Sequence, residues 1–241
     1  MKNKSIILTI FLFAFLSNLV AQEKKQQIHR WKFGINAGAG YYTPSNKDAK
    51  RSLEESGVNK KTADSFYNKL KWAATFDVHA YYLFNSNMGA GIRYNFARSS
   101  AKESDIHISN SFYNLIVDIE DRVYVNYVGP SFYFQKWIDS SNKWLLNGSI
   151  TLGYVHYREE SEVMYSTLLA TAHSIGSSVN IGVEYFFNKS WSVGLDYSFF
   201  GSTLNRVKID DGYQSESIKL KGDDKINLSR MNLMAGIRFH L

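Results

Sequence analysis

Three ionisable residues, Arg93, Glu184 and Asp196, stand in stretches that are otherwise rich in apolar and small residues. Each lies in the alternating set that carries Gly, Ser and Asn rather than large apolar groups. An unpaired charge in a protein interior is costly, so these side chains are expected to pair with one another. Paired acids and bases could hold an interior together, or they could pass protons or ions.

Two acids facing one arginine leave an unbalanced charge, so further partners are required. We expect Asp77 to pair with Arg230, and we expect His79 and Arg238 to lie nearby. The predicted lumen charge network therefore has seven members: Asp77, His79, Arg93, Glu184, Asp196, Arg230 and Arg238. Structural filling of the interior and an ion or proton conduit are both open interpretations.

Other chemistry has little support in the sequence. The chain contains no cysteine, so a thiol nucleophile, a disulfide or a thiolate zinc site is excluded. His156 and His173 flank a long loop, but no further metal ligands stand near them in the sequence. We expect no catalytic residue, no bound metal and no cofactor.

The segments that carry these charged residues are predicted to be strands. From Trp191 to Phe200 the apolar residues occupy every second position, which is typical of a strand with two different faces. The same alternation covers eight segments in all: 31–42, 74–84, 90–97, 127–136, 146–157, 178–187, 191–200 and 231–241. Most are near the length of roughly 9 to 11 residues that a tilted strand needs to cross a bilayer.

The connections between these segments alternate between long and short. Those at 44–72, 98–122, 158–174 and 201–225 are long and polar, whereas those at 85–89, 138–143 and 188–190 are short. This pattern predicts an all-β fold, an eight-stranded antiparallel up-and-down transmembrane β-barrel. A soluble barrel of the lipocalin kind is the alternative, but it would hold its bulky apolar groups inside. Here the opposite face is small and polar, so the apolar face is expected to meet lipid.

The first residues read as a secretory signal peptide. Two lysines precede an apolar run from Ile6 to Phe15, and a small residue, Ala21, follows. We expect cleavage after Ala21, which leaves residues 22–241 as one barrel domain. Removing residues 1–21 takes away Lys2 and Lys4 and no acid, so the formal net charge falls from +6 by two units to +4. This modest excess gives a nucleic-acid partner little support.

The last strand carries a further pattern. A glycine, an aromatic residue and a final hydrophobic residue stand at fixed spacing in Gly236, Phe239 and Leu241, and an earlier stretch reads Tyr-x-Gly-Pro at 127–130. Both resemble the outer-membrane β-barrel domain family, the small porin-like barrels of OmpA and OmpX type. The resemblance implies insertion by the barrel-assembly machinery into a Gram-negative outer membrane, in contact with outer-membrane lipids and lipopolysaccharide. The alternation of long and short connections predicts that both termini are periplasmic.

One short stretch resembles an enzyme. His107, Ile108, Ser109 and Asn110 are similar to the His-x-Ser-Asn stretch of outer-membrane lipid A deacylases, a resemblance that implies a histidine activating a serine for acyl transfer. An acid at Glu120 or Asp121 would orient the histidine. The stretch follows the third predicted strand, which is not its place in that family.

The long loops offer another role. The stretches 49–55 and 62–70 are expected to form short helices, and 112–117 and 217–220 are expected to extend the barrel as an exposed sheet edge. Such an edge can add a partner strand. We therefore expect a monomeric, non-enzymatic barrel that serves envelope structure or binds an extracellular ligand through four external loops. A narrow channel for ions or small solutes is the second hypothesis, and a lipid A deacylase-like hydrolase is the third.

Overall fold

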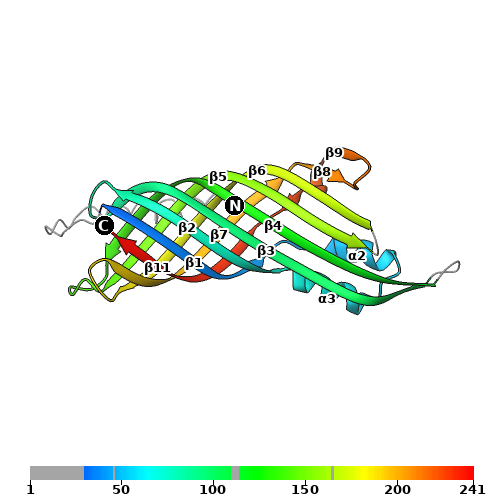
Figure 1. The fold of residues 1–241 in the computed structure, drawn as a ribbon, viewed down its shortest axis with the longest axis horizontal. Coiled ribbons are helices and arrows are strands. Elements are labelled where there is room, and N and C mark those ends of the chain that lie inside the picture. The colour runs from blue at the N-terminus through cyan, green and yellow to red at the C-terminus, as the bar shows by residue number, and fades with distance from the viewer. Residues whose placement is uncertain (1–29, 46, 110–113, 164–165) are drawn as a thin grey trace, which may run out of the picture.

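A computed structural model describes residues 30–45, 47–109, 114–163 and 166–241 of the chain (Figure 1). The proposed signal peptide and Asn110 lie outside the described residues. The strands are β1 Trp31–Tyr42, β2 Trp72–Leu83, β3 Met88–Ser109, β4 Asn114–Trp137, β5 Trp144–Val163, β6 Ser166–Phe186, β7 Trp191–Leu204, β8 Arg206–Asp210, β9 Ser215–Lys219, β10 Ile226–Asn227 and β11 Arg230–His240. The helices are α2 Lys47–Glu55, α3 Lys60–Leu70 and the short 3-10 turn η1 Gly222–Asp224.

Eight long antiparallel strands close into a ring, as the alternation predicts. Each of β1 to β6 pairs with the next strand, and β11 lies between β7 and β1. In the closing pair, Lys32 lies opposite His240 and Tyr42 lies opposite Arg230. The first and last strands of the domain are therefore neighbours, and no edge is left within the ring.

Asparagine and aspartate side chains close the three short turns. Asn188 accepts hydrogen bonds from the backbone N–H groups of Ser190 and Trp191, at 2.9 and 2.8 Å. Asn85 and Asp139 do the same for the other two turns. These residues suit tight turns because their short polar side chains replace a backbone acceptor. We call this end of the barrel, where the chain also ends at Leu241, the turn end.

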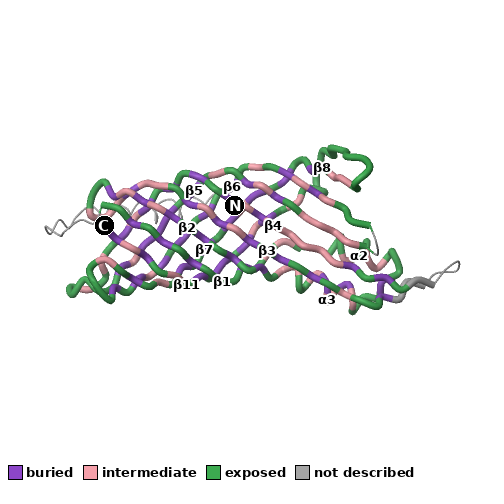
Figure 2. Tube along the Cα trace, in the orientation of Figure 1, coloured by how far each residue is buried: buried purple, intermediate pink, exposed green. Residues whose placement is uncertain are grey.

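The two faces of the strands differ as the alternation predicts (Figure 2). Along β7, Val193, Leu195 and Tyr197 are exposed on the outside, whereas Ser192, Asp196 and Ser198 are buried inside. The outer face therefore carries large apolar groups that only a lipid environment would cover favourably.

Four strands run far beyond the ring at the end opposite the turns (Figure 1). The segments 98–122 and 158–174, expected to be loops, are largely strand: β3 pairs with β4 up to Ser109, and β5 pairs with β6 up to Val163. The segment 201–225 likewise contains β8 and β9. The polarity of these segments is misleading, since strands above a membrane have no lipid-facing side. We call the part formed by the outer halves of β3 to β6 with α2, α3 and β8 to β10 the extension.

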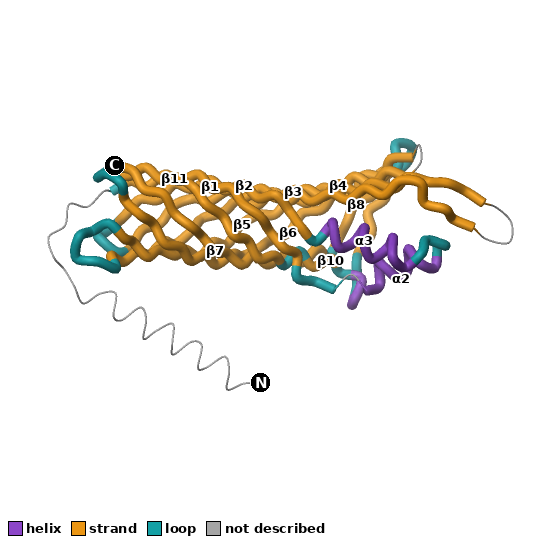
Figure 3. Tube along the Cα trace, turned by 90° about the horizontal axis from the view of Figure 1, so that it is seen from below, coloured by secondary structure: helices purple, strands orange, loops and turns teal. Residues whose placement is uncertain are grey.

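Both helices expected in the first loop are present and belong to the extension (Figure 3). Asn59 caps α3 by accepting a hydrogen bond from the N–H of Thr62 at 2.9 Å. Phe66 of α3 packs with Ile106 and Ile119 on one face of the β3–β4 sheet. None of the helices in the described residues is long and apolar enough to cross a membrane.

Candidate functional site

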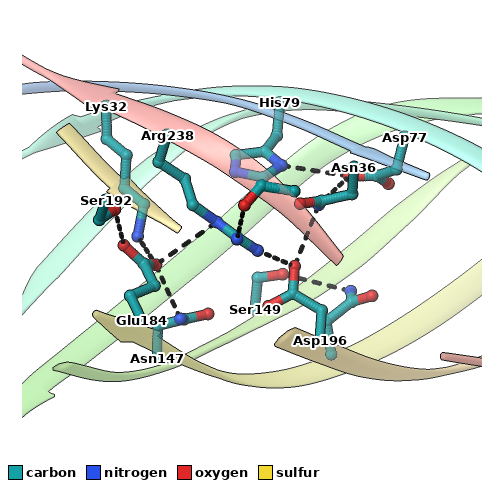
Figure 4. A network of polar contacts seen from close by, with 12 residues as sticks. Lys32, Asn36, Asp77, His79, Asn147, Ser149, Glu184, Ser192, Asp196 and Arg238 are labelled. Carbon is teal, nitrogen blue, oxygen red and sulfur yellow. Dashed lines mark hydrogen bonds and ion pairs between the residues drawn. The ribbon is translucent and has the colours of Figure 1, made fainter. Parts of the chain in front are cut away.

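The barrel interior near the turn end is organised around the carboxylate of Glu184 (Figure 4). It forms an ion pair with Lys32 and accepts hydrogen bonds from Asn147 at 2.8 Å and Ser192 at 3.0 Å. The Nε2 atom of His240 lies 3.4 Å from the same carboxylate. Glu184 is thus surrounded by donors from four different strands, which compensates the cost of its burial.

A second carboxylate, Asp77, occupies the middle of the barrel. Its Oδ2 accepts a hydrogen bond from Arg93 at 2.6 Å, and its Oδ1 lies 3.1 Å from His79 Nδ1. Asn36 donates to the same Oδ1 at 3.2 Å and to Asp196 at 3.0 Å. Asn36 therefore connects the two central carboxylates.

Arg238 joins the two parts of the network. It donates to Asp196 at 2.5 Å, and its Nε lies 3.9 Å from Glu184. The expected pairing of Asp77 with Arg230 is wrong. Arg230 instead donates to Asn95 at 2.7 Å and to Asn232 at 2.6 Å, further toward the extension. The stagger between the tilted strands separates residues that simple counting along each strand would place level with one another.

Glycines provide the room that this network needs. A side chain at Gly34 would overlap the ring of His79, and one at Gly182 would overlap the carboxylate of Asp196. Small residues on the inward face therefore let longer charged residues from the neighbouring strand cross the lumen.

The structure places all seven sequence-predicted residues in the buried interior. Six of them meet in one network, while Arg230 stands apart. The sequence analysis did not include Lys32 and His240 in the network. Alternation along the strand could have identified both, because Lys32 points to the same inward side as Asn36, and His240 to the same inward side as Arg238.

Above the charges, the lumen becomes apolar and aromatic. The rings of Tyr127 and Phe200 lie 5.0 Å apart, and the guanidinium of Arg230 lies 5.3 Å from the ring centres of both Phe200 and Tyr42. These groups belong to or border a buried cluster that continues into the extension: Ala73, Ala97, Val125, Tyr127, Val155, Tyr157, Ala170, Ala172, Phe200, Leu204, Val207 and Leu228. The charged interior that the sequence predicts is therefore found in the turn-end half of the barrel only.

Between the charge network and this cluster lies a cavity of about 10 Å³, lined by Asp77, Arg93, Tyr127 and Phe200 among others. That volume holds about one water molecule. At this level of the barrel, side chains therefore occupy most of the lumen, as the width of an eight-stranded barrel predicts.

The extension has two chemically different faces. On the outer face Arg122 pairs with Glu120 at 2.6 Å and with Glu162 at 3.1 Å. On the inner face Asp121 and Glu159 are partly buried, and they accept hydrogen bonds from two hydroxyl groups, Ser161 Oγ and Tyr157 Oη respectively, both at 2.5 Å.

Burial raises the pKa of Asp121 and of Glu159, and the proximity of Asp121 adds to the rise at Glu159.

The strand register does not assemble the expected acyl-transfer group. His107 pairs with Ile116, whereas Glu120 pairs with Lys102. Glu120 is thus four residues further along β4, about 13 Å at roughly 3.3 Å per residue. Asp121, one residue beyond, is hydrogen-bonded to Ser161. The acid expected to orient His107 is engaged elsewhere.

His156 and His173 are brought together across β5 and β6, with their Nδ1 atoms 3.4 Å apart and Tyr154 Oη in contact with His173. Within the described residues no group of three or more His, Cys, Asp and Glu side chains could hold a metal ion.

Comparison with known proteins gives a family match across the chain. Residues 10–239 match the model of the outer membrane protein beta-barrel domain. Curated proteins give no match to the sequence.

Among solved structures the chain is similar to the attachment invasion locus protein Ail of Yersinia pestis, at 12% identity and a TM-score of 0.40 over 89% of this chain and 100% of that one. Neisserial surface protein A matches at 13% identity and a TM-score of 0.47 over 88% and 97%. The outer membrane protease OmpT of Escherichia coli matches at 11% identity and a TM-score of 0.46 over 90% and 99%.

Proposed function

The chain belongs to the outer membrane protein beta-barrel domain family, and we propose that it is a closed, non-enzymatic barrel that acts at the cell surface through its extension. The observation that carries this proposal is the contrast between the two halves of the molecule. The lumen is filled by charge pairs and an apolar cluster, whereas the extension presents a large sheet beyond the ring. Loops and strands held on a rigid scaffold often carry binding.

The β8–β9 hairpin is the best-defined recognition element of this surface. Among the described strands β9 stands last in the sheet order and pairs with β8 alone, and all five of its residues are exposed. A bare edge of this kind can add a strand from a partner. Tyr213 at the tip is 97% exposed, which supplies an aromatic contact for the same partner.

The proposal also covers the surroundings of the barrel. Outer-membrane lipids and lipopolysaccharide would cover the apolar face. The barrel-assembly machinery would recognise β11, in which Gly236 and Phe239 are paired with β1. The protein would act as a monomer, with its short turns and both termini in the periplasm.

A conductance measurement tests the closed lumen. The purified barrel in a planar bilayer is expected to show no steady unitary current, because the cavity above Arg93 has room for about one water molecule. Stable currents in the unaltered protein that change with Arg93→Ala would contradict the proposal and favour the narrow channel.

Cysteine labelling tests the orientation, and the chain is suited to it because it contains no native cysteine. On intact cells, Gln214→Cys in the β8–β9 turn is expected to react with a membrane-impermeant maleimide. Asn188→Cys in a short turn is expected to react only after the outer membrane is opened. The reverse pattern would place the extension in the periplasm and overturn the surface role.

A further inference from the structure

The extension contains a pocket that the proposed function does not use. It has a volume of about 210 Å³ and lies where β5 and β6 meet the β8–β9 hairpin. Its apolar walls are formed by Leu168, Ala170, Val207, Ile209, Ile218, Leu220 and Ile226. An apolar cavity of about 150 Å³ can bind benzene, so this pocket accommodates a ring or a short hydrocarbon chain with a polar group attached.

The polar part of the pocket wall is acidic. Glu159 and Ser161 of β5 line it, and Ser161 donates its hydroxyl hydrogen to Asp121 of β4. The register places Val123 opposite Glu159 and Asp121 opposite Ser161, so both carboxyl groups are on the inner face of adjacent strands. Asp121 is close enough to Glu159 to add to the rise in the pKa of Glu159 that burial causes.

In the part of the chain that the structure describes, these two acids form no ion pair, since neither Asp121 nor Glu159 has a Lys, Arg or His within ion-pair distance. Arg122 and Arg158 are near in sequence but lie on the outer face, where they pair with Glu120, Glu160 and Glu162. The other titratable groups facing the two acids are hydroxyls, from Tyr157 on β5 and Tyr67 on α3.

From this combination we infer that the pocket binds a small apolar molecule that carries an amine. The hydrocarbon part would fill the space among the Ile and Leu side chains, where burial of apolar surface provides the affinity. The ammonium group would donate hydrogen bonds to Glu159 and supply the positive charge that the inner face lacks. An anionic molecule of the same shape would meet two like charges and be rejected.

This inference deepens the proposed surface function, because it assigns a ligand class to the extension. The ligand site is formed by the chain itself and does not depend on which side of the membrane it faces. Ligand binding is therefore measured on the protein in detergent, and the orientation is measured by cysteine labelling on cells. A negative result in one experiment does not decide the other.

Three matched probes test the inference: phenethylamine, 2-phenylethanol and 3-phenylpropionate. Each is titrated into the refolded barrel, and the methyl resonances of its isoleucines are followed by NMR. Saturable shifts of Ile209, Ile218 and Ile226 are expected with phenethylamine, weaker ones with the alcohol and none with the acid. Ile181 and Ile237 are exposed on the outer, lipid-facing side of the barrel. Shifts of their resonances therefore report unspecific partition of a probe into the detergent.

Three variants separate the contribution of the Glu159 charge to binding from that of the shape of the pocket. Glu159→Gln is expected to weaken phenethylamine binding at least tenfold while leaving the alcohol unchanged. The matched control Glu160→Gln removes an acid from the opposite face and is expected to leave both unchanged. Ala170→Leu fills the pocket floor and is expected to abolish binding of both.

Several results would overturn the inference. These are equal affinity for all three probes, absence of saturable shifts at the pocket isoleucines, or an unchanged phenethylamine affinity in Glu159→Gln. Saturable binding of Ca²⁺ at Glu159 and Asp121 without any amine binding would show an ordinary cation site instead.

Discussion

Arg93→Met is expected to reduce the free energy of unfolding by about 3–5 kcal/mol, because it leaves the carboxylate of Asp77 buried without its closest cation. The Arg93 Nε to Asp77 Oδ2 distance is 2.6 Å, and both side chains are buried in the centre of the barrel. His79 and Asn36 would be the partners left to Asp77. Urea unfolding in phospholipid vesicles, followed by tryptophan fluorescence, measures the loss.

Two further variants make this result specific. Arg93→Met combined with Asp77→Asn is expected to recover much of the loss, since replacing both members of a buried ion pair is far less costly than removing one. Arg98→Met removes an arginine of the same strand from the outer face, where its ring contact with Tyr124 is at 5.7 Å. It is expected to cost below about 1 kcal/mol. A loss as large as that of Arg93→Met would contradict a central role for the buried pair.

Leu195→Arg is expected to destabilise the membrane-inserted barrel by about 2–4 kcal/mol, the cost of an arginine facing lipid near the midplane. Leu195 is 55% exposed, in the middle of the part of β7 that carries the apolar band. The same vesicle-based unfolding experiment measures the change.

The control for this variant is Phe187→Arg at the turn end, where the side chain is similarly exposed at 52%. An arginine there reaches the headgroups and is expected to cost only about 0–1 kcal/mol. The difference between the two sites reports depth in a bilayer. Nearly equal, small losses at both sites would mean that the apolar face meets water.

Much of the barrel follows from a period of two in the sequence. In β7 the alternation of Val193 and Leu195 with Ser192 and Asp196 predicts both the strand and the face that each residue occupies. Alternation is a local property, because successive side chains of a strand point to opposite sides. The inward position of the seven predicted lumen residues could be predicted for the same reason.

The strands of the extension could not be predicted from alternation. Lys102 and Glu120 look like residues of a solvated loop, yet they lie opposite one another in a regular strand pair. Outside the membrane, a strand does not need an apolar face. The composition of these segments therefore does not distinguish a strand from a loop. The apolar cluster around Phe200 was missed because its members come from distant segments that only the closed fold brings together.

The sequence by itself determined an outward apolar face, an inward face rich in small and polar residues, and short connections at 85–89, 138–143 and 188–190. Only the tertiary structure decided which charges meet: Lys32 with Glu184, and Arg93 rather than Arg230 with Asp77. The physical reason is that pairing across a lumen depends on ring closure and on the stagger of tilted strands. Both are properties of all eight strands together, and no single segment encodes them.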